Sequence, residues 1–233
     1  MPYAVVSGGT QGIGKATSEK LLSNGFSVAI CARSADDLKQ LEAEWKAKYP
    51  NAQILAIPTD VTKKENVQTF AQKVLDVFPA IDILVNNAGT YYPGNISDEP
   101  DGQLESMMAL NTYSAYHLTR AVLPAIKKSS KGHIFNMCSI AALHAYPGGG
   151  AYSISKYALL GFSENLRLEM VPHNIRVTSI CAGAVLTRSW GDSVSPDRIM
   201  KPEDIADTIW SAYSLSPAAN IDTIVIRPQQ GDL

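Results

Sequence analysis

The sequence predicts one α/β domain, residues 1–233, in which about seven parallel strands form a doubly wound sheet with helices on both faces. Short, almost wholly apolar runs rich in β-branched residues recur along the chain, and amphipathic stretches of helical periodicity separate them. A length of 233 residues suits a single domain, and no repeat, charge block or low-complexity linker marks a second. In chain order, we expect strands at residues 3–7, 27–32, 53–57, 81–85, 133–138, 175–180 and 223–227.

The charge balance and the apolar content of the chain limit the classes of binding partner that we expect for it. Lys and Arg number 20 against 22 Asp and Glu, so no basic surface is expected for nucleic acid or an anionic membrane. No run of about 18 uncharged apolar residues predicts a membrane span. The three cysteines lie in apolar contexts and suggest reduced thiols, and no signal peptide is evident. We therefore expect a cytoplasmic protein.

A glycine-rich turn, Ser7-Gly8-Gly9-Thr10-Gln11-Gly12-Ile13-Gly14-Lys15, follows the first expected strand. Glycines at such a turn let the backbone approach a pyrophosphate at the helix N-terminus, although they also simply connect strands to helices. The segment Gly9-x4-Gly14-Lys15 also begins a nucleoside triphosphate-binding loop. Ala16 then stands where that loop needs a hydroxyl for Mg²⁺, which disfavours a kinase or NTPase.

Tyr152 and Lys156 lie four residues apart at the start of an expected helix, so both side chains share one face. A nearby ammonium favours the phenolate and lowers the pKa of a tyrosine, which suits general acid/base catalysis. The alternative is an ordinary surface pair with the tyrosine ring packed on the core.

Several motifs together resemble the short-chain dehydrogenase/reductase family, in its short single-domain subtype with a Rossmann-type fold. These are Gly8-x3-Gly12-x-Gly14, Asp60-Val61, Asn86-Asn87-Ala88-Gly89, Asn111 in an expected helix at 104–129, Ser139 at a strand end, and Tyr152-x3-Lys156. Two departures are Ser7, where the family usually has Thr, and Ala182, where it usually has Pro. Gly183, Val185 and Thr187 stay in register with the family's motif after the sixth strand.

The resemblance implies hydride transfer between a nicotinamide and a substrate that alternates between carbonyl and secondary alcohol. Tyr152 is then the general acid/base, Lys156 lowers its pKa and binds the nicotinamide ribose, Ser139 polarises the carbonyl, and Asn111 holds a water that links Lys156 to solvent. No catalytic metal is expected. The residues expected to bind the cofactor are Gly8, Thr10, Gln11, Gly12, Ile13, Gly14, Arg33, Ser34, Asp60, Val61, Asn87, Ala88, Gly89, Tyr152, Lys156, Gly183, Val185 and Thr187.

The end of the second strand favours NADP(H) over NAD(H). Enzymes that bind NAD commonly place a carboxylate there, but this chain has Ala32 followed by Arg33 and Ser34. Arg33 offers a guanidinium fork to a 2′-phosphate. A solvated Arg33, with Asp36 or Asp37 reaching the ribose, is the alternative; those carboxylates are better explained as the first turn of the next helix.

Three loops that follow strand ends, 90–102, 144–150 and 186–201, are expected to bind a small carbonyl or alcohol substrate. The sequence does not choose among oxoacyl thioesters, hydroxy acids, pterins, steroids and ketones, although the C-terminus lacks the Asp-Gly-Gly ending of many oxoacyl reductases.

The family implies a homo-oligomer, dimer or tetramer, formed through the helices that hold Asn111 and Tyr152. A regulator that binds NADP without catalysis is the alternative, but it would be free to lose Tyr152 or Lys156. The candidate pocket residues are Thr90, Tyr91, Tyr92, Pro93, Ala141, His144, Tyr146 and Trp190.

Overall fold

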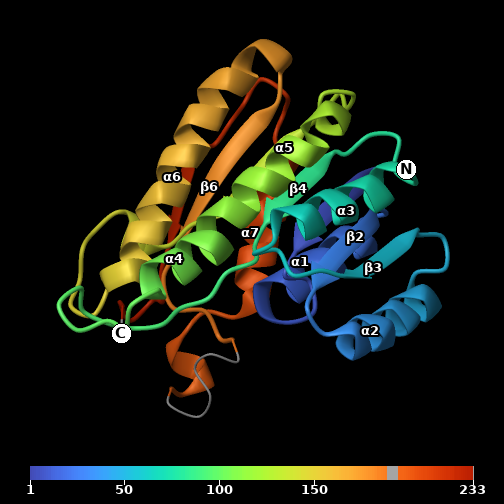
Figure 1. Cartoon of the computed structure of the whole chain (residues 1–233). Helices are drawn as coiled ribbons and strands as arrows, with labels where there is room; N and C mark the ends of the chain where they lie inside the picture. The colour runs from blue at the N-terminus through green and yellow to red at the C-terminus, as the bar shows by residue number, and fades with distance from the viewer. Residues whose placement is uncertain (188–193, 233) are drawn as a thin grey trace.

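The computed structural model describes residues 1–187 and 194–232, and it contains one seven-stranded parallel sheet in the order β3-β2-β1-β4-β5-β6-β7 (Figure 1). All seven expected strands are confirmed, and no strand end differs from its expected position by more than two residues. The strands are β1 (Tyr3–Ser7), β2 (Ser27–Ala32), β3 (Ile54–Pro58), β4 (Ile83–Asn86), β5 (His133–Met137), β6 (Arg176–Ala182) and β7 (Thr223–Ile226).

Helices cover both faces of the sheet, as the apolar strands predict. On one face Leu21, Trp45 and Ile205 belong to a core cluster built from α1, α2 and α7. On the other, Phe70, Val122 and Leu166 join α3, α5 and α6 to a second cluster. The helices are α1 (Gly12–Ser23), α2 (Ala35–Lys48), α3 (Lys64–Leu75), α4 (Gln103–Met108), α5 (Ser114–Ile126), α6 (Gly150–Met170) and α7 (Pro202–Ser214).

The prediction of a single helix at 104–129 is wrong. The chain instead forms α4, a π-helical turn η1 (Ala109–Tyr113) and α5. The wider turn lets two side chains reach α6: Asn111 Nδ2 donates to Ser155 Oγ at 2.9 Å, and Thr112 Oγ1 donates to the Ser155 carbonyl at 2.8 Å. Contacts with a helix that is distant in the sequence therefore offset the poorer hydrogen bonding of the turn.

The first turn of α2 confirms the helix-start interpretation of Asp36 and Asp37. The Ser34 hydroxyl accepts the Asp37 amide hydrogen at 3.2 Å, and both carboxylates lie in the first helical turn.

The strand order places a crevice at the carboxyl ends of β1 and β4. β1 lies between β2 and β4 in the sheet. The chain leaves β1 and β4 toward opposite faces of the sheet. The loop before α1 and the loop at 90–102 start at this edge. Among the described residues, no helix has the length and hydropathy needed to cross a membrane.

Candidate active site

The glycine-rich turn after β1 is folded tightly against its neighbours. The amides of Gly8 and Gly9 both donate to the Cys31 carbonyl of β2, at 2.9 and 3.2 Å. Gly8 has φ +69°, which favours glycine, and a Cβ on Gly14 would lie 2.1 Å from the Gly8 carbonyl oxygen. The start of α1 can therefore approach this turn only because position 14 is glycine.

Ser7 and Asn87 join the glycine turn to the end of β4. The Ser7 hydroxyl accepts the amide hydrogens of Asn87 and Ala88, both at 3.0 Å. In return, Asn87 Nδ2 donates to the carbonyls of Ser7 and Gly8, at 2.9 and 3.1 Å. The serine that departs from the usual threonine thus keeps a hydroxyl that this junction uses.

The segment after β6 completes the same cradle. A Cβ on Gly12 would lie 3.2 Å from Thr187 Cγ2, so Thr187 lies against the glycine turn. Gly183 N donates to the Ile226 carbonyl at 2.8 Å, and Val185 is buried and pairs with Met200. Of the other predicted residues of the glycine turn, Gln11 is the exposed N-cap residue of α1, Thr10 is half-buried, and Ile13 packs against the first core cluster.

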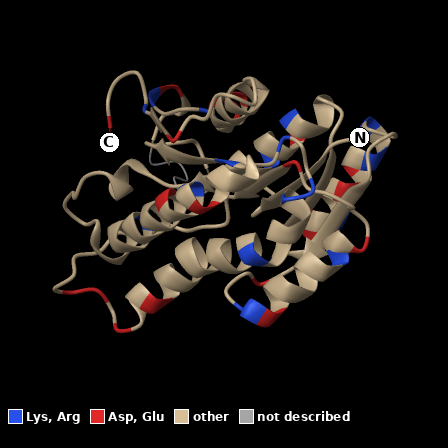
Figure 2. Ribbon diagram, turned by 90° about the horizontal axis from the view of Figure 1, so that it is seen from above, with Lys and Arg blue, Asp and Glu red and all other residues tan. Residues whose placement is uncertain are grey.

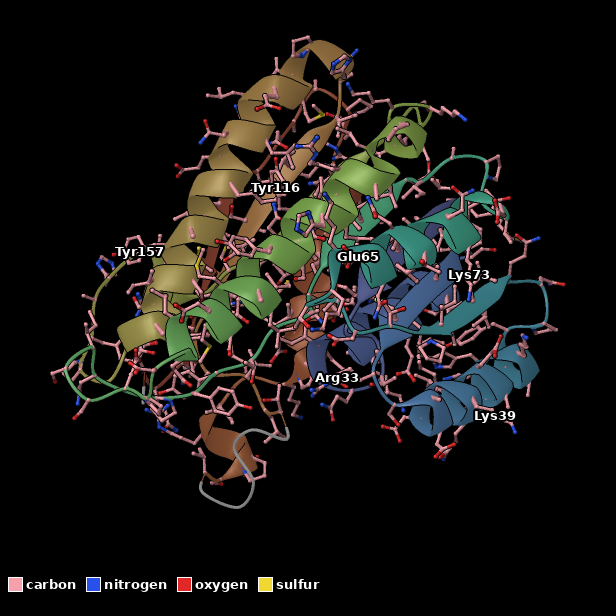
Figure 3. The ribbon with its side chains drawn as sticks, in the orientation of Figure 1. Arg33, Lys39, Glu65, Lys73, Tyr116 and Tyr157 are labelled. Carbon is pink, nitrogen blue, oxygen red and sulfur yellow. The ribbon has the colours of Figure 1, made fainter. Side chains whose placement is uncertain are left out.

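Arg33 (Figure 3) and Asp60 follow the carboxyl ends of β2 and β3, at one end of this cradle. Hydrogen bonds from Thr62 are the main reason that the pKa of Asp60 is lowered, and the positive charge of Arg33 contributes. The Arg33 side chain is exposed, and among the described residues it forms no ion pair. Val61, beside Asp60, is buried. A guanidinium is thus available at the position predicted to contact a phosphate.

Ser139, Tyr152 and Lys156 come together at the ends of β5 and α6. Ser139 ends the β5 segment and starts the short helix η2 (Ile140–Ala142), where its Oγ accepts the Ala141 amide hydrogen at 3.1 Å. Its hydroxyl also lies near enough to the Tyr152 phenol to lower the pKa of that phenol. Lys156 Nζ donates to the Met137 carbonyl at 2.8 Å and lies 5.8 Å from the centre of the Tyr152 ring. Three residues far apart in sequence therefore form one polar cluster.

The pKa of Tyr152 differs from the sequence-based expectation. Burial raises it, and the nearby Ser139 hydroxyl opposes that rise. Burial also lowers the pKa of Lys156, because the low-dielectric surroundings disfavour its charged form. The lowering of the Tyr152 pKa by Lys156 stays a prediction.

Asn111 is placed near Lys156, and both polar atoms of its side chain bind protein groups. Its Oδ1 accepts the Thr90 amide hydrogen at 2.8 Å, and its Nδ2 donates to the Thr90 carbonyl and to Ser155 Oγ, at 3.1 and 2.9 Å. A Cβ on Gly89 would lie 3.1 Å from Asn111 Oδ1 and 3.6 Å from Lys156 Nζ. Asn111 therefore holds the loop after β4 in place, and its binding of a water stays a prediction.

Sequence reasoning missed Ser155 and Glu99. Ser155 is fully buried inside the Tyr152-x3-Lys156 motif, accepts from Asn111 and donates to the Tyr152 carbonyl at 2.7 Å. Glu99 accepts the Ala151 amide hydrogen at the start of α6. The motif spacing marks only the ends of the Tyr-x3-Lys segment, and nothing local indicates that residue 99 reaches α6.

Aromatic side chains from two of the expected substrate loops gather at Tyr152. The rings of Tyr91 and Tyr152 meet edge to face, with centroids 4.8 Å apart. Tyr146 lies close to Tyr91; burial raises the pKa of Tyr146, and the nearby Tyr91 adds to that rise. His144 is exposed in the same loop, and Trp190 lies outside the described residues. Two of the predicted pocket residues, Tyr91 and Tyr146, are therefore in contact next to Tyr152.

The residues of the cradle fit a dinucleotide. The glycine turn brings backbone close to the start of α1, where a Cβ on Gly14 would clash, and an exposed guanidinium lies at the ends of β2 and β3. At the other end, the Lys156 ammonium donates to Met137, and among the described residues it has no second hydrogen-bond acceptor, so it keeps N–H donors for a ligand. The site can thus hold a phosphate-bearing ligand next to a phenol, a hydroxyl and an amine.

Comparisons with known proteins agree with this arrangement. The family model described as short chain dehydrogenase matches residues 2–197. An uncharacterized oxidoreductase of Staphylococcus epidermidis is 30% identical over 226 residues, which cover 97% of this chain and 96% of the relative.

Two solved structures are similar over the whole chain. An alcohol dehydrogenase from Thermococcus sibiricus, complexed with 5-hydroxy-NADP, has a TM-score of 0.92 at 25% identity and covers 100% of this chain and 99% of its own. L-sorbose reductase from Gluconobacter frateurii, complexed with NADPH and L-sorbose, has a TM-score of 0.89 at 27% identity and covers 100% and 96%. With the glycine turn, the Asn87 junction and the Ser139–Tyr152–Lys156 cluster all in place, the chain belongs to the short-chain dehydrogenase/reductase family of oxidoreductases.

Proposed function

We propose that this oxidoreductase interconverts a carbonyl compound and a secondary alcohol, with NADP(H) as its cofactor and Tyr152 as general acid/base. The observation that carries the proposal is the placement of the Ser139 hydroxyl beside the Tyr152 phenol, with the buried Lys156 ammonium next to them at the edge of the glycine cradle. A phenol and a hydroxyl that converge on one point suit a carbonyl oxygen that gains negative charge.

Each side chain of the cluster has a distinct task in this mechanism. Bound NADPH supplies the hydride, and the protein supplies placement and electrostatics. Tyr152 donates its phenolic proton to the carbonyl oxygen in reduction and takes the proton back in oxidation. Ser139 donates a hydrogen bond to the same oxygen. Lys156 would hold the ribose of the cofactor with its other N–H groups and would stabilise the Tyr152 phenolate left after proton transfer.

The cofactor proposal rests on Arg33 and is supported by the two solved relatives bound to NADP or its derivative. Replacement of Arg33 by alanine is expected to weaken NADPH binding by roughly 10- to 100-fold, because a hydrogen bond to a charged phosphate contributes about 1.5–3 kcal/mol. NADH, which lacks the 2′-phosphate, should bind both proteins equally. Fluorescence titration with each dinucleotide measures the two affinities.

Lys39→Ala is a matched control for Arg33→Ala. Lys39 is an exposed cation about one turn into α2, the helix that follows Arg33 (Figure 3). It should leave both affinities unchanged. An Arg33→Ala protein with undiminished NADPH affinity contradicts this assignment.

The described loops near Tyr152 favour a substrate without negative charge. The loop at 90–102 carries Asp98, Glu99 and Asp101 and no Lys or Arg, and Figure 2 shows its acidic positions without basic ones. The loop at 144–150 adds no charged residue apart from the titratable His144. Like charges repel an anionic substrate, whereas the Tyr91 and Tyr146 rings offer apolar and hydrogen-bonding contact.

A panel of carbonyl compounds tests the reaction and this charge preference together. Loss of NADPH absorbance is expected with neutral ketones and hydroxyketones, at a higher kcat/KM than with acyl-coenzyme A thioesters or oxo acids. The repulsion of anionic substrates should weaken at high salt, since screening shortens its range. Turnover of anionic carbonyls alone contradicts the charge preference, and tight NADPH binding without any turnover contradicts the proposed activity.

We also propose a homo-oligomer in the cytoplasm. Tyr116 on α5 and Tyr157 on α6 are large exposed side chains on neighbouring helices, and Figure 3 shows both on the same face. Such a surface suits a second copy of the chain. The three cysteines, Cys31, Cys138 and Cys181, are free and buried, which is consistent with a reducing compartment.

A further inference from the structure

The first turn of α6 carries Tyr152 and lacks a cap from its own segment. The N-cap residue is Gly149, which has no side chain, so it cannot accept any of the amide hydrogens at the helix start. Ala151, which directly precedes Tyr152, is fully buried. Its amide hydrogen must therefore find an acceptor elsewhere in the protein.

Glu99 supplies that acceptor from a loop 52 residues earlier in the chain. Its Oε1 accepts the Ala151 amide hydrogen at 2.8 Å. A carboxylate in this position also opposes the positive end of the helix dipole. The start of α6 is thus held by a side chain from the loop at 90–102.

Two glycines make room for the Glu99 side chain. A Cβ on Gly150 would lie 1.9 Å from Glu99 Oε1, and a Cβ on Gly94 would lie 2.6 Å from Glu99 Cγ. Any other residue at either position would displace the carboxylate. The local backbone is therefore built around this side chain.

Further hydrogen bonds tie the same two loops together. Gly94 N donates to the Gly148 carbonyl at 3.0 Å, and Gly148 N donates to Asn95 Oδ1 at 3.2 Å. The first of these loops also carries Tyr91, whose ring packs against Tyr152. Glu99 therefore lies at the junction of both loops and the helix that positions the phenol.

We propose that Glu99 is a positioning residue that sets the location of Tyr152 relative to Ser139 by holding the first turn of α6. The inference rests on the proposed function, in which Tyr152 exchanges a proton with the substrate. Glu99 contacts neither the glycine cradle nor Arg33 in the described structure, so its effect should fall on the chemical step and spare cofactor binding.

Three variants test this role in the full-length protein: Glu99→Ala, Glu99→Gln and the control Glu169→Ala. In Glu99→Ala the Ala151 amide hydrogen loses its acceptor, and kcat for a neutral ketone should fall about 10- to 100-fold, since small displacements of catalytic groups have effects of this size. The affinity for NADPH should stay unchanged. Glu99→Gln retains an oxygen acceptor and should restore most of kcat. Glu169→Ala removes an exposed carboxylate at the other end of α6, far from Tyr152, and should behave as wild type.

The possible outcomes distinguish a residue that positions Tyr152 from one that only stabilises the fold. If Glu99→Ala lowers the melting temperature and keeps the wild-type kcat, Glu99 is a structural cap only and the proposal is wrong. If kcat and NADPH affinity fall together, the variant damages the whole site, which also contradicts the proposal. Failure of the proposed function itself has a different signature, because Tyr152→Phe would then keep full activity whatever the Glu99 variants do.

Discussion

Replacement of Tyr152 by phenylalanine is expected to lower kcat by about 10³-fold, because the variant keeps the ring and loses the proton that the phenol exchanges with the substrate oxygen. NADPH affinity should change little, since the glycine cradle, Arg33 and the Lys156 ammonium remain. The ring still packs edge to face on Tyr91, so the melting temperature should be close to that of wild type. Steady-state kinetics with a neutral ketone, NADPH titration and thermal unfolding measure the three quantities.

Tyr157→Phe is the matched control for this experiment. Tyr157 lies on the same helix, α6, and is 45% exposed (Figure 3). It loses the same hydroxyl without touching the polar cluster and should keep wild-type kcat. A Tyr152→Phe protein that oxidises NADPH at the wild-type rate means that the phenol is not the proton donor.

Replacement of Lys156 by methionine is expected to lower kcat by about 10²-fold or more and to weaken NADPH binding as well. The variant loses the charge that stabilises the Tyr152 phenolate and the donors proposed to bind the ribose. Because both properties fall, its kinetic signature differs from that of Tyr152→Phe. The exposed Lys73 on α3 supplies a control variant, Lys73→Met, which should alter neither property.

The Lys156 variant should not be less stable than wild type near neutral pH. Burial lowers the pKa of Lys156, so between the folded and unfolded pKa values the unfolded chain binds more protons than the folded protein. The free energy of unfolding of the wild type therefore rises with pH through that window. Below that window the folded protein holds the buried amine in its charged form, and its stability is reduced by the full cost of burying the charge. Urea unfolding should show the largest gain for Lys156→Met near pH 7 and a smaller gain as the pH nears about 10. A loss of stability at pH 7 contradicts this account.

Much of the site follows from local sequence. Tyr152 and Lys156 share a helix face because of their spacing alone, and the glycines at 8, 12 and 14 stand where the chain must turn sharply and then start a helix. Arg33 follows a strand whose end any parallel sheet places at the ligand-binding edge. These features depend on backbone geometry over a few residues, and pattern reasoning captures such geometry well.

Other features depend on contacts between distant segments. The π-helical turn at Asn111 forms because Asn111 and Thr112 reach Ser155, and the periodicity of residues 104–129 carries no trace of that contact. The pKa of Tyr152 is likewise set by how much protein surrounds it, and burial outweighs the effect of the nearby Ser139 hydroxyl. Spacing suggests only that an ammonium is near.

The sequence by itself determined that this chain is a parallel α/β sheet with a phosphate-binding turn and a Tyr-Lys pair on one helix face, because each of these is encoded by residues close together in the chain. Only the tertiary structure decided that Glu99 holds the start of α6 and that the Asn111 side chain hydrogen-bonds Thr90 and Ser155. Both are bonds between a side chain and a backbone or hydroxyl group more than 20 residues away. Their partners become neighbours only after the sheet and helices have packed.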